Sequence, residues 1–203
     1  MNNIEIIKIY EKIFYKGFIK EEEVILVKSN VGKVNAARIT QMIIDKFDIK
    51  LIINAGTAGS VNNELDIGDI VVSSNLVQYD FDVTPFGRKL GEIENIGEDI
   101  KVNKDILKIF EKIPVFIGCI ATGDKFIIND NEKQAIKNQF DALCIEMEGA
   151  SVAQVCKLNN IPFIVIRSIT DKQDGSSKID FETFLESSSK KVADLLYNVI
   201  DKF

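Results

Sequence analysis

Two short apolar runs in this chain end abruptly in acidic and polar residues. One ends in Glu146-Met147-Glu148, and a later one ends in Arg167-Ser168-Ile169-Thr170-Asp171. A parallel strand delivers side chains to the carboxyl edge of an α/β sheet in this way. We therefore expect two carboxylates, those of Glu148 and Asp171, to converge on one pocket.

The chain contains no histidine. Proton transfer near neutral pH must therefore use a carboxylate, a lysine, a tyrosine or a cysteine. This restriction makes Glu148 and Asp171 the first candidates for acid–base chemistry.

Length and charge restrict the kind of protein. The chain has 203 residues, of which 46% are hydrophobic, and nothing in it resembles a linker, so we expect a single domain over residues 1–203. A net charge of -6 argues against nucleic acid as a partner, because proteins that bind it concentrate positive charge. The apolar runs are too short to span a bilayer and the N-terminus lacks a signal pattern. We expect no membrane partner and a cytoplasmic location.

Three cysteines, Cys119, Cys144 and Cys156, lie in apolar surroundings. Their number is odd and their spacing is not that of metal ligands. We therefore expect buried, reduced thiols.

Strands alternate with amphipathic helices along the chain. Apolar runs bounded by turn residues predict strands over 13–19, 24–28, 51–54, 70–77, 115–121, 142–145 and 162–166. Helical spacing of apolar residues predicts helices over 32–47, 103–112, 132–140, 149–158 and 181–203, with Asn30 as a candidate cap of the first. The first two strands form a hairpin, and the long polar stretch over 79–97 is expected to be functional or part of an interface. The alternation predicts an α/β fold, a three-layer α/β/α sandwich with a mixed central sheet.

Seven motifs are similar, in this order, to those of one protein family. They are Lys28-Ser29-Asn30-Val31-Gly32-Lys33, Asn54-Ala55-Gly56-Thr57-Ala58-Gly59, Asp69-Ile70-Val71-Val72-Ser73, Asp82-Val83-Thr84-Pro85-Phe86-Gly87, Gly123-Asp124-Lys125-Phe126, Glu146-Met147-Glu148 and Arg167-Ser168-Ile169-Thr170-Asp171. Nearly the whole chain thus resembles the 5'-methylthioadenosine/S-adenosylhomocysteine nucleosidases of the nucleoside phosphorylase superfamily. The resemblance implies a nucleoside phosphorylase-like fold, an adenine nucleoside as ligand, and hydrolysis of its N-glycosidic bond to adenine and a 5-thioribose product. It implies no cofactor and no metal.

The chemistry of this bond explains two residues. Its cleavage develops positive charge on the ribose and negative charge on the base, so an acid must protonate the leaving purine. The resemblance assigns this role to Asp171, beside N7 of adenine, and a buried carboxyl group with a raised pKa would hold such a proton at neutral pH. It assigns Glu148 to the ribose, because an ionised carboxylate accepts hydrogen bonds from two vicinal hydroxyls.

The resemblance also implies residues that bind the rest of the substrate. Met147 and Thr57 are implied to contact the ribose, and Phe126 and the backbone of Ile127 the base. Val31 and Phe181 are implied to line the pocket of the 5'-alkylthio group. The resemblance adds Thr170, Glu146 and Arg167 to the set. Val83 and Phe86 reach the same pocket from a second subunit, which implies a homodimer.

Several of these residues have plainer explanations. Thr170 and Asp171 are residue types that commonly cap turns. Glu146 is equally explained as a charge near a helix N-terminus, and Arg167 as a structural partner of a carboxylate. Phe126 lies in an apolar run and, without the resemblance, would be assigned to the core.

The N-terminal part departs from the family pattern. Family members begin with an apolar strand that ends in a Gly-Ala-Met-Glu-Glu-Glu type of turn, whose glutamate activates the attacking water. This sequence has no equivalent, and we interpret Glu21-Glu22-Glu23 as a solvated turn between two strands. Either the sequence starts late, or another group supplies the base, or hydrolysis is impaired. A milder departure is Asn30, which replaces a usual glycine.

Three functions stay open. The first is the hydrolase. The second is a purine nucleoside phosphorylase, in which cationic residues would surround a phosphate; Asn54 stands where hexameric purine phosphorylases carry an arginine and cannot match its charge. The third is a truncated, non-catalytic form that binds adenine nucleosides without turnover.

Overall fold

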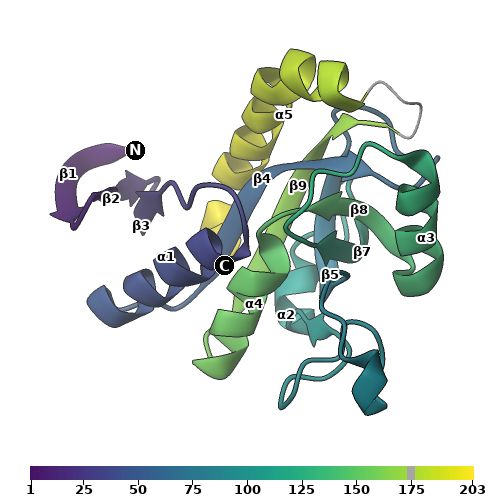
Figure 1. Ribbon diagram of the computed structural model, residues 1–203. Coiled ribbons are helices and arrows are strands. Elements are labelled where there is room, and N and C mark those ends of the chain that lie inside the picture. The colour runs from purple at the N-terminus through teal and green to yellow at the C-terminus, as the bar shows by residue number, and fades with distance from the viewer. Residues whose placement is uncertain (173–176) are drawn as a thin grey trace.

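The computed structural model describes residues 1–172 and 177–203, with the backbone alone for 177–180. Its strands form two separate sheets, one of three strands and one of six (Figure 1). The six-stranded sheet contains both parallel and antiparallel pairs, and helices pack around it. The predicted α/β fold with a mixed central sheet is confirmed.

The small sheet is antiparallel and consists of β1 (Asn2–Ile9), β2 (Lys12–Ile19) and β3 (Glu22–Val27). The hairpin predicted for β2 and β3 is confirmed, and the three glutamates at its turn, over 21–23, are exposed as expected. The sequence analysis missed β1, because two adjacent isoleucines interrupt the alternation of apolar and polar residues in this segment.

One face of the small sheet packs on the rest of the molecule and the other is open. Phe14 is fully buried, and its ring centroid lies 5.6 Å from that of Phe47, the residue after α1 (Lys33–Lys46). On the opposite face Ile6, Tyr15 and Leu26 are partners across the three strands and are exposed. The small sheet therefore contributes a single face to the core.

The large sheet has the strand order β6-β5-β7-β8-β4-β9. Its strands are β4 (Ile52–Ser60), β5 (Ile70–Gln78), β6 (Ile100–Lys101), β7 (Phe116–Thr122), β8 (Ala142–Glu146) and β9 (Phe163–Asp171). The start of β5 also pairs with β9, so the sheet curls until these two strands meet. This order places β4 between β8 and β9, the two strands that carry the acidic motifs.

The remaining helices are α2 (Lys104–Lys108), α3 (Asp130–Phe140), α4 (Gly149–Leu158) and α5 (Ser177–Val199), with short 3-10 turns at Thr84–Phe86 and Ile200–Lys202. Helix α5 packs on β4 and β9, α3 packs on β7 and β8, and α4 lies between α1 and the sheet (Figure 1). The predicted bounds of α4 are confirmed. Asn30 is not the cap of α1, because Gly32 occupies that position and Asn30 has a left-handed backbone with φ of 70°.

Two strands extend beyond their predicted ends. The strand predicted over 51–54 continues through Gly56-Thr57-Ala58-Gly59, because this segment belongs to β4, which pairs with β9 from Ile52 to Gly59. β9 itself continues to Asp171 and is buried along its whole length. Glycine at position 59 lets β4 and the Asp171 side chain approach each other closely, since a Cβ atom there would lie 2.7 Å from a carboxylate oxygen of Asp171.

The buried apolar residues form two clusters, one with Cys144 and Cys156 and a smaller one with Cys119. Burial raises the pKa of Cys119 and of Cys156 to about 12, so these thiols are inert near neutral pH, as expected. Among the helices of the described residues, none combines the length and apolarity that a membrane crossing requires.

Candidate active site

The ends of β8 and β9 meet at one residue of β4. Gly59 pairs with Ile145 of β8 on one side and with Asp171 of β9 on the other. Glu148 lies two residues after the end of β8, at the N-cap of α4. The large sheet therefore brings the two predicted acidic motifs to the same part of its edge.

Glu148 is held by the backbone of α1. Its Oε1 atom accepts a hydrogen bond of 2.9 Å from the N–H of Gly32, and its other oxygen lies 3.9 Å from the guanidinium of Arg167. Burial raises the pKa of Glu148, and the nearby carboxylate of Glu146 adds to this; the Gly32 N–H and Arg167 oppose the shift. About a fifth of the side chain is exposed, so Glu148 can reach a ligand.

Glu146 and Arg167 form a buried ion pair behind Glu148. The guanidinium lies 2.5 Å from Oε2 of Glu146, and both side chains are almost completely buried. Oε2 of Glu146 also accepts the backbone N–H groups of Glu148 and Gly149 at 3.0 and 2.7 Å, while Oε1 accepts the hydroxyl of Thr122. This geometry agrees with the structural explanation given for each residue: Glu146 is a charge at a helix N-terminus, and Arg167 is its ion-pair partner.

Asp171 lies in a sealed environment. It is 2% exposed, and its Oδ2 atom is 3.1 Å from the ammonium of Lys133 on α3. The hydroxyl of Thr170, itself buried, donates to Oδ1 at 3.1 Å. The sequence analysis missed Lys133. A signal existed, because Lys133 shares the buried face of α3 with Ile136, where helical spacing calls for an apolar residue.

Three charged residues that the sequence analysis did not assign join α1 to the loop before α3. Asp80 accepts from the ammonium of Lys33 at 2.6 Å and from the backbone N–H of Asp124 at 2.9 Å. Asp124 in turn accepts from the backbone N–H of Lys33 at 2.8 Å. We call Lys33, Asp80 and Asp124 the loop clamp. No local sequence signal predicts it, since its members come from three separate segments.

The predicted base-binding residues lie next to the loop clamp. The rings of Phe126 and Phe181 meet edge to face with centroids 5.6 Å apart, and Phe126 remains partly exposed. Ile127 is buried in a small apolar cluster with β7 and β8. The structure therefore brings Phe126 and Phe181, which are far apart in the sequence, into contact.

The other predicted binding residues differ in exposure. Thr57 on β4 and Met147 after β8 are half-buried, and Val31 before α1 is exposed. Val83 and Phe86 lie in the segment between β5 and β6, which projects from the body at the bottom of the view in Figure 1. Phe86 is 85% exposed.

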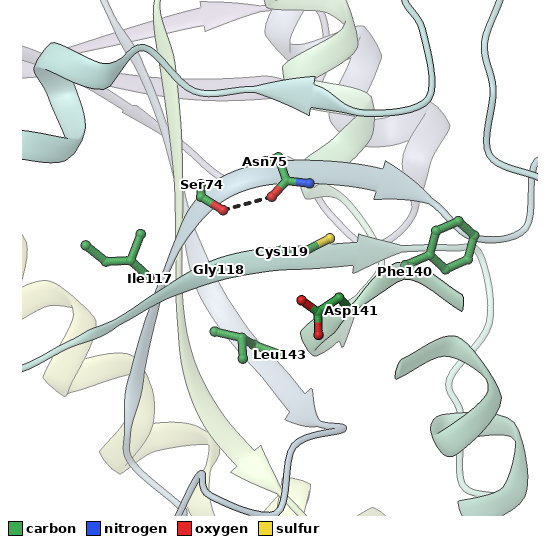
Figure 2. A pocket seen from close by; sticks show the side chains of 8 residues that line it. All are labelled: Ser74, Asn75, Ile117, Gly118, Cys119, Phe140, Asp141 and Leu143. Atoms are coloured by element: carbon green, nitrogen blue, oxygen red, sulfur yellow. Dashed lines mark hydrogen bonds between the residues drawn. The ribbon is translucent and has the colours of Figure 1, made fainter. Parts of the chain in front are cut away.

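Two other hollows in the surface are separate from these carboxylates. One cavity of about 280 Å³ lies over the middle of β5 and β7, and Figure 2 shows the residues around it: Ser74, Asn75, Ile117, Gly118, Cys119, Phe140, Asp141 and Leu143. A second of similar volume is lined by Lys101, Asn103, Lys157, Asn160, Ile161, Pro162 and Phe163. Neither includes Glu148 or Asp171. Within the described part of the chain, no three His, Cys, Asp or Glu side chains gather as a metal site would require.

The fold and this site define an α/β protein that presents two carboxylates, in unlike surroundings, at the ends of the strands that flank β4. A family model described as Phosphorylase superfamily matches residues 1–201. The 5'-methylthioadenosine/S-adenosylhomocysteine nucleosidase of Staphylococcus haemolyticus is 39% identical over 194 residues, which cover 92% of this chain and 85% of that protein. The chain therefore belongs to the phosphorylase superfamily and, within it, to the family of these nucleosidases. The family resemblance indicated by the seven motifs is confirmed.

Solved structures agree with this placement. The Helicobacter pylori 5'-methylthioadenosine/S-adenosylhomocysteine nucleosidase, in complex with a pyrrolidine compound, superposes with a TM-score of 0.94 at 33% identity over 98% of this chain and 89% of its own. A structure described as futalosine hydrolase of Helicobacter pylori superposes with a TM-score of 0.92, also at 33% identity, over 98% of this chain and 88% of its own.

Proposed function

We propose that this protein hydrolyses the N-glycosidic bond of 5'-methylthioadenosine and of S-adenosylhomocysteine, releasing adenine and the 5-thioribose product. Membership of the nucleosidase family supports this activity. The observation that carries the proposal is the contrast between its two carboxylates, a sealed Asp171 and a partly exposed Glu148 on either side of β4.

In this proposal the two carboxylates have separate tasks. Asp171 gives its proton to N7 of the purine while the bond between N9 and C1' breaks, and the electron pair of that bond stays on the purine. Glu148 accepts hydrogen bonds from the ribose hydroxyls, and its negative charge favours the cationic sugar of the transition state. Thr170 keeps the Asp171 carboxyl in place, and Arg167 with Glu146 supports Glu148 from behind.

The remaining contacts follow the family resemblance. Phe126 stacks on the adenine and the backbone of Ile127 reads its edge, while Met147 and Thr57 lie against the ribose. Val31 and Phe181 line the pocket of the 5'-alkylthio group, and the contact between Phe126 and Phe181 supports a shared ligand for these two rings.

The burial and the hydrogen bonds of Arg167 favour hydrolysis over phosphorolysis. Its guanidinium is 1% exposed and donates to Glu146, to the carbonyl of Ile166, and to both the side chain and the carbonyl of Asn54. A group with these partners is not available to a phosphate ion. Asn54, at the position of the phosphorylase arginine, therefore serves to hold Arg167.

The test is adenine release by the purified protein from 5'-methylthioadenosine and from S-adenosylhomocysteine, in buffer with and without phosphate. Release that is independent of phosphate supports the hydrolase. Release only with phosphate identifies a phosphorylase, and binding without release identifies a non-catalytic nucleoside-binding protein. Futalosine, assayed in parallel, shows whether the site prefers the substrate named for the second Helicobacter pylori structure.

We also propose that the protein is a homodimer in which Val83 and Phe86 of one subunit reach the alkylthio pocket of the other. The exposure of Phe86 supports this, because a large apolar side chain in a projecting segment is typical of a contact surface. Light scattering at micromolar concentration is expected to give twice the mass of the 22.8 kDa chain, and Phe86→Ser is expected to shift the equilibrium toward a monomer. A monomeric wild-type protein would exclude this arrangement.

The proposed location is the cytoplasm. Three buried free thiols fit a reducing compartment. Cell fractionation with an antibody against the chain tests this assignment.

A further inference from the structure

Lys133 is a fully buried lysine whose ammonium contacts the carboxyl that the proposed reaction uses as its acid. It is 0% exposed, and its Nζ atom lies 3.1 Å from Oδ2 of Asp171 and donates to the carbonyl of Lys172 at 2.9 Å. Lysine is almost never completely buried unless it is paired. A methionine would fill the same space without removing a charge from water, so packing alone does not account for Lys133.

The carboxyl of Asp171 is enclosed by groups from three elements. Lys133 reaches it from α3, and the Thr170 hydroxyl reaches it from β9. On the β4 side the backbone of Gly59 is so close that an added Cβ atom would lie 2.7 Å from Oδ2. Of these three neighbours Lys133 brings a full positive charge, while the others fix the plane of the carboxyl group.

Lys133 also connects the acid to the base-binding loop. The helix that carries it starts at Asp130, shortly after Phe126 and Ile127, and the side chain of Asn129 caps its first turn by accepting from the N–H of Glu132 at 3.1 Å. Because Lys133 lies in the first turns of the same helix, its ion pair ties the loop that contacts the base to the residue that protonates the base.

We propose that Lys133 is a positioning residue for Asp171, an inference that rests on the proposed nucleosidase function. Its ammonium holds one oxygen of the carboxyl and stabilises the carboxylate that Asp171 becomes when it gives its proton away. The O–H bond of Asp171 breaks and the N7–H bond of the purine forms, while water adds its hydroxyl to C1' and releases the proton that restores Asp171. Negative charge appears on Asp171 only along this step, so the nearby ammonium favours the transition state over the bound substrate.

The same ion pair has a consequence for base binding. Lys133 holds the Asp171 carboxyl in the place where it meets N7 of the purine. A purine analogue with carbon in place of N7 loses this contact and is expected to bind more weakly.

The first experiment measures kcat and KM for 5'-methylthioadenosine with Lys133→Met, Lys133→Arg and the control Lys137→Met, which removes the same charge one turn further along α3. We expect Lys133→Met to lower kcat at least about tenfold without raising KM, because stabilisation is lost only in the transition state. Lys133→Arg keeps the charge and is expected to recover most of kcat, and Lys137→Met is expected to match the wild type. An unchanged kcat, or a fall in kcat matched by a rise in KM, would overturn the inference.

The second experiment does not depend on turnover. Calorimetry of adenine and of 7-deazaadenine binding measures how much affinity the contact with N7 contributes. We expect the wild type and Lys137→Met to bind adenine about tenfold more tightly than 7-deazaadenine. Lys133→Met is expected to lose most of this preference, because the Asp171 carboxyl is no longer held in place beside N7. Thermal unfolding of each variant verifies that it is folded.

These results separate the two ideas. An equal preference for adenine over 7-deazaadenine in the wild type and Lys133→Met would reject the role of Lys133, whatever the activity. Adenine binding with the expected difference in this preference, but no release from any nucleoside, would reject the proposed hydrolysis and keep the role of Lys133. Failure of the wild type to bind adenine would reject both.

Discussion

The two carboxylates of the site lie on either side of β4 and have opposite surroundings. Glu148 is partly exposed and accepts a hydrogen bond from a neutral backbone donor, the N–H of Gly32; the Arg167 guanidinium, 3.9 Å away, is already paired with Glu146. Asp171 is sealed and is held by a full charge, the ammonium of Lys133. A carboxylate can therefore perform two different tasks, depending on the environment that the structure gives it. The more accessible carboxylate suits ligand binding, and the enclosed carboxylate suits proton transfer.

The two carboxylates also differ in the elements that hold them in place. Glu148 depends on α1, which the loop clamp holds in place, and on the buried pair of Glu146 and Arg167. Asp171 depends on α3 through Lys133. Changes at one carboxylate should therefore affect the other weakly, and the following variants test that independence.

The largest effect is expected from Asp171→Asn. Loss of the acid is expected to lower adenine release from 5'-methylthioadenosine by about 10²- to 10⁴-fold, with a small change in KM, because general acid catalysis contributes on this scale. The control is Asp141→Asn. It changes a carboxylate at the cavity over β5 and β7, and asparagine tolerates the left-handed backbone at this position. Activity retained in Asp171→Asn would end the assignment of Asp171 as the acid.

Arg167→Met should produce the next largest effect, on stability. It leaves the buried carboxylate of Glu146 without its partner, which is expected to lower the free energy of unfolding by about 3–5 kcal/mol in a urea titration. Arg38 pairs with Glu11 at the exposed surface, and Arg38→Met is expected to leave the unfolding midpoint unchanged. Similar unfolding midpoints for both variants would show that the buried pair contributes little.

Glu148→Gln separates sugar binding from base binding. A neutral amide accepts hydrogen bonds from the ribose hydroxyls less strongly than a carboxylate does. Affinity for a non-hydrolysable adenine nucleoside is expected to fall about 10- to 100-fold, while affinity for adenine stays the same. Calorimetry with the two ligands measures both. An equal loss for both ligands would place Glu148 beside the base or in a purely structural role.

Asp80→Asn tests the loop clamp. The residue accepts from both Lys33 and Asp124, so its loss is expected to weaken the placement of Gly32 and Glu148 and to lower nucleoside affinity by about fivefold, the scale of one partly exposed ion pair. The preference for adenine over 7-deazaadenine, the readout for Asp171, is expected to stay constant. A change in that preference would show that the two carboxylates are coupled.

The smallest effect concerns pH and stability. Burial raises the pKa of Glu148 in the folded protein, so its contribution to stability is fully present below the pKa of the unfolded chain and is lost as pH rises through the folded value. Glu148→Gln is therefore expected to raise the free energy of unfolding by about 0.5–1 kcal/mol at pH 7 and not at pH 4. The exposed variant Glu21→Gln serves as the control, and a gain of equal size at both pH values would contradict the assigned cause.

Much of the fold follows from local pattern. The helix α4 was predicted with its observed bounds, since its apolar residues keep a helical period and its ends are polar. The ends of β8 and β9 carry the acidic residues as predicted, because polar residues that follow an apolar run lie at the carboxyl end of a strand in an α/β sheet. The glycine-rich segment of β4 lies beyond the strand predicted over 51–54, because small residues without apolar neighbours give no strand signal until pairing with β9 supplies one.

The residue types that carry the chemistry follow from the amino-acid sequence: without histidine, carboxylates are the first candidates for the acid, and seven motifs indicate a nucleosidase family that the relatives confirm. The surroundings of these residues depend on how the helices and strands pack. The loop clamp and the pair of Lys133 with Asp171 join segments that are distant along the chain. Helical and strand periods report the neighbours of a residue within its own element, whereas the partner of a buried charge is set by how the elements pack.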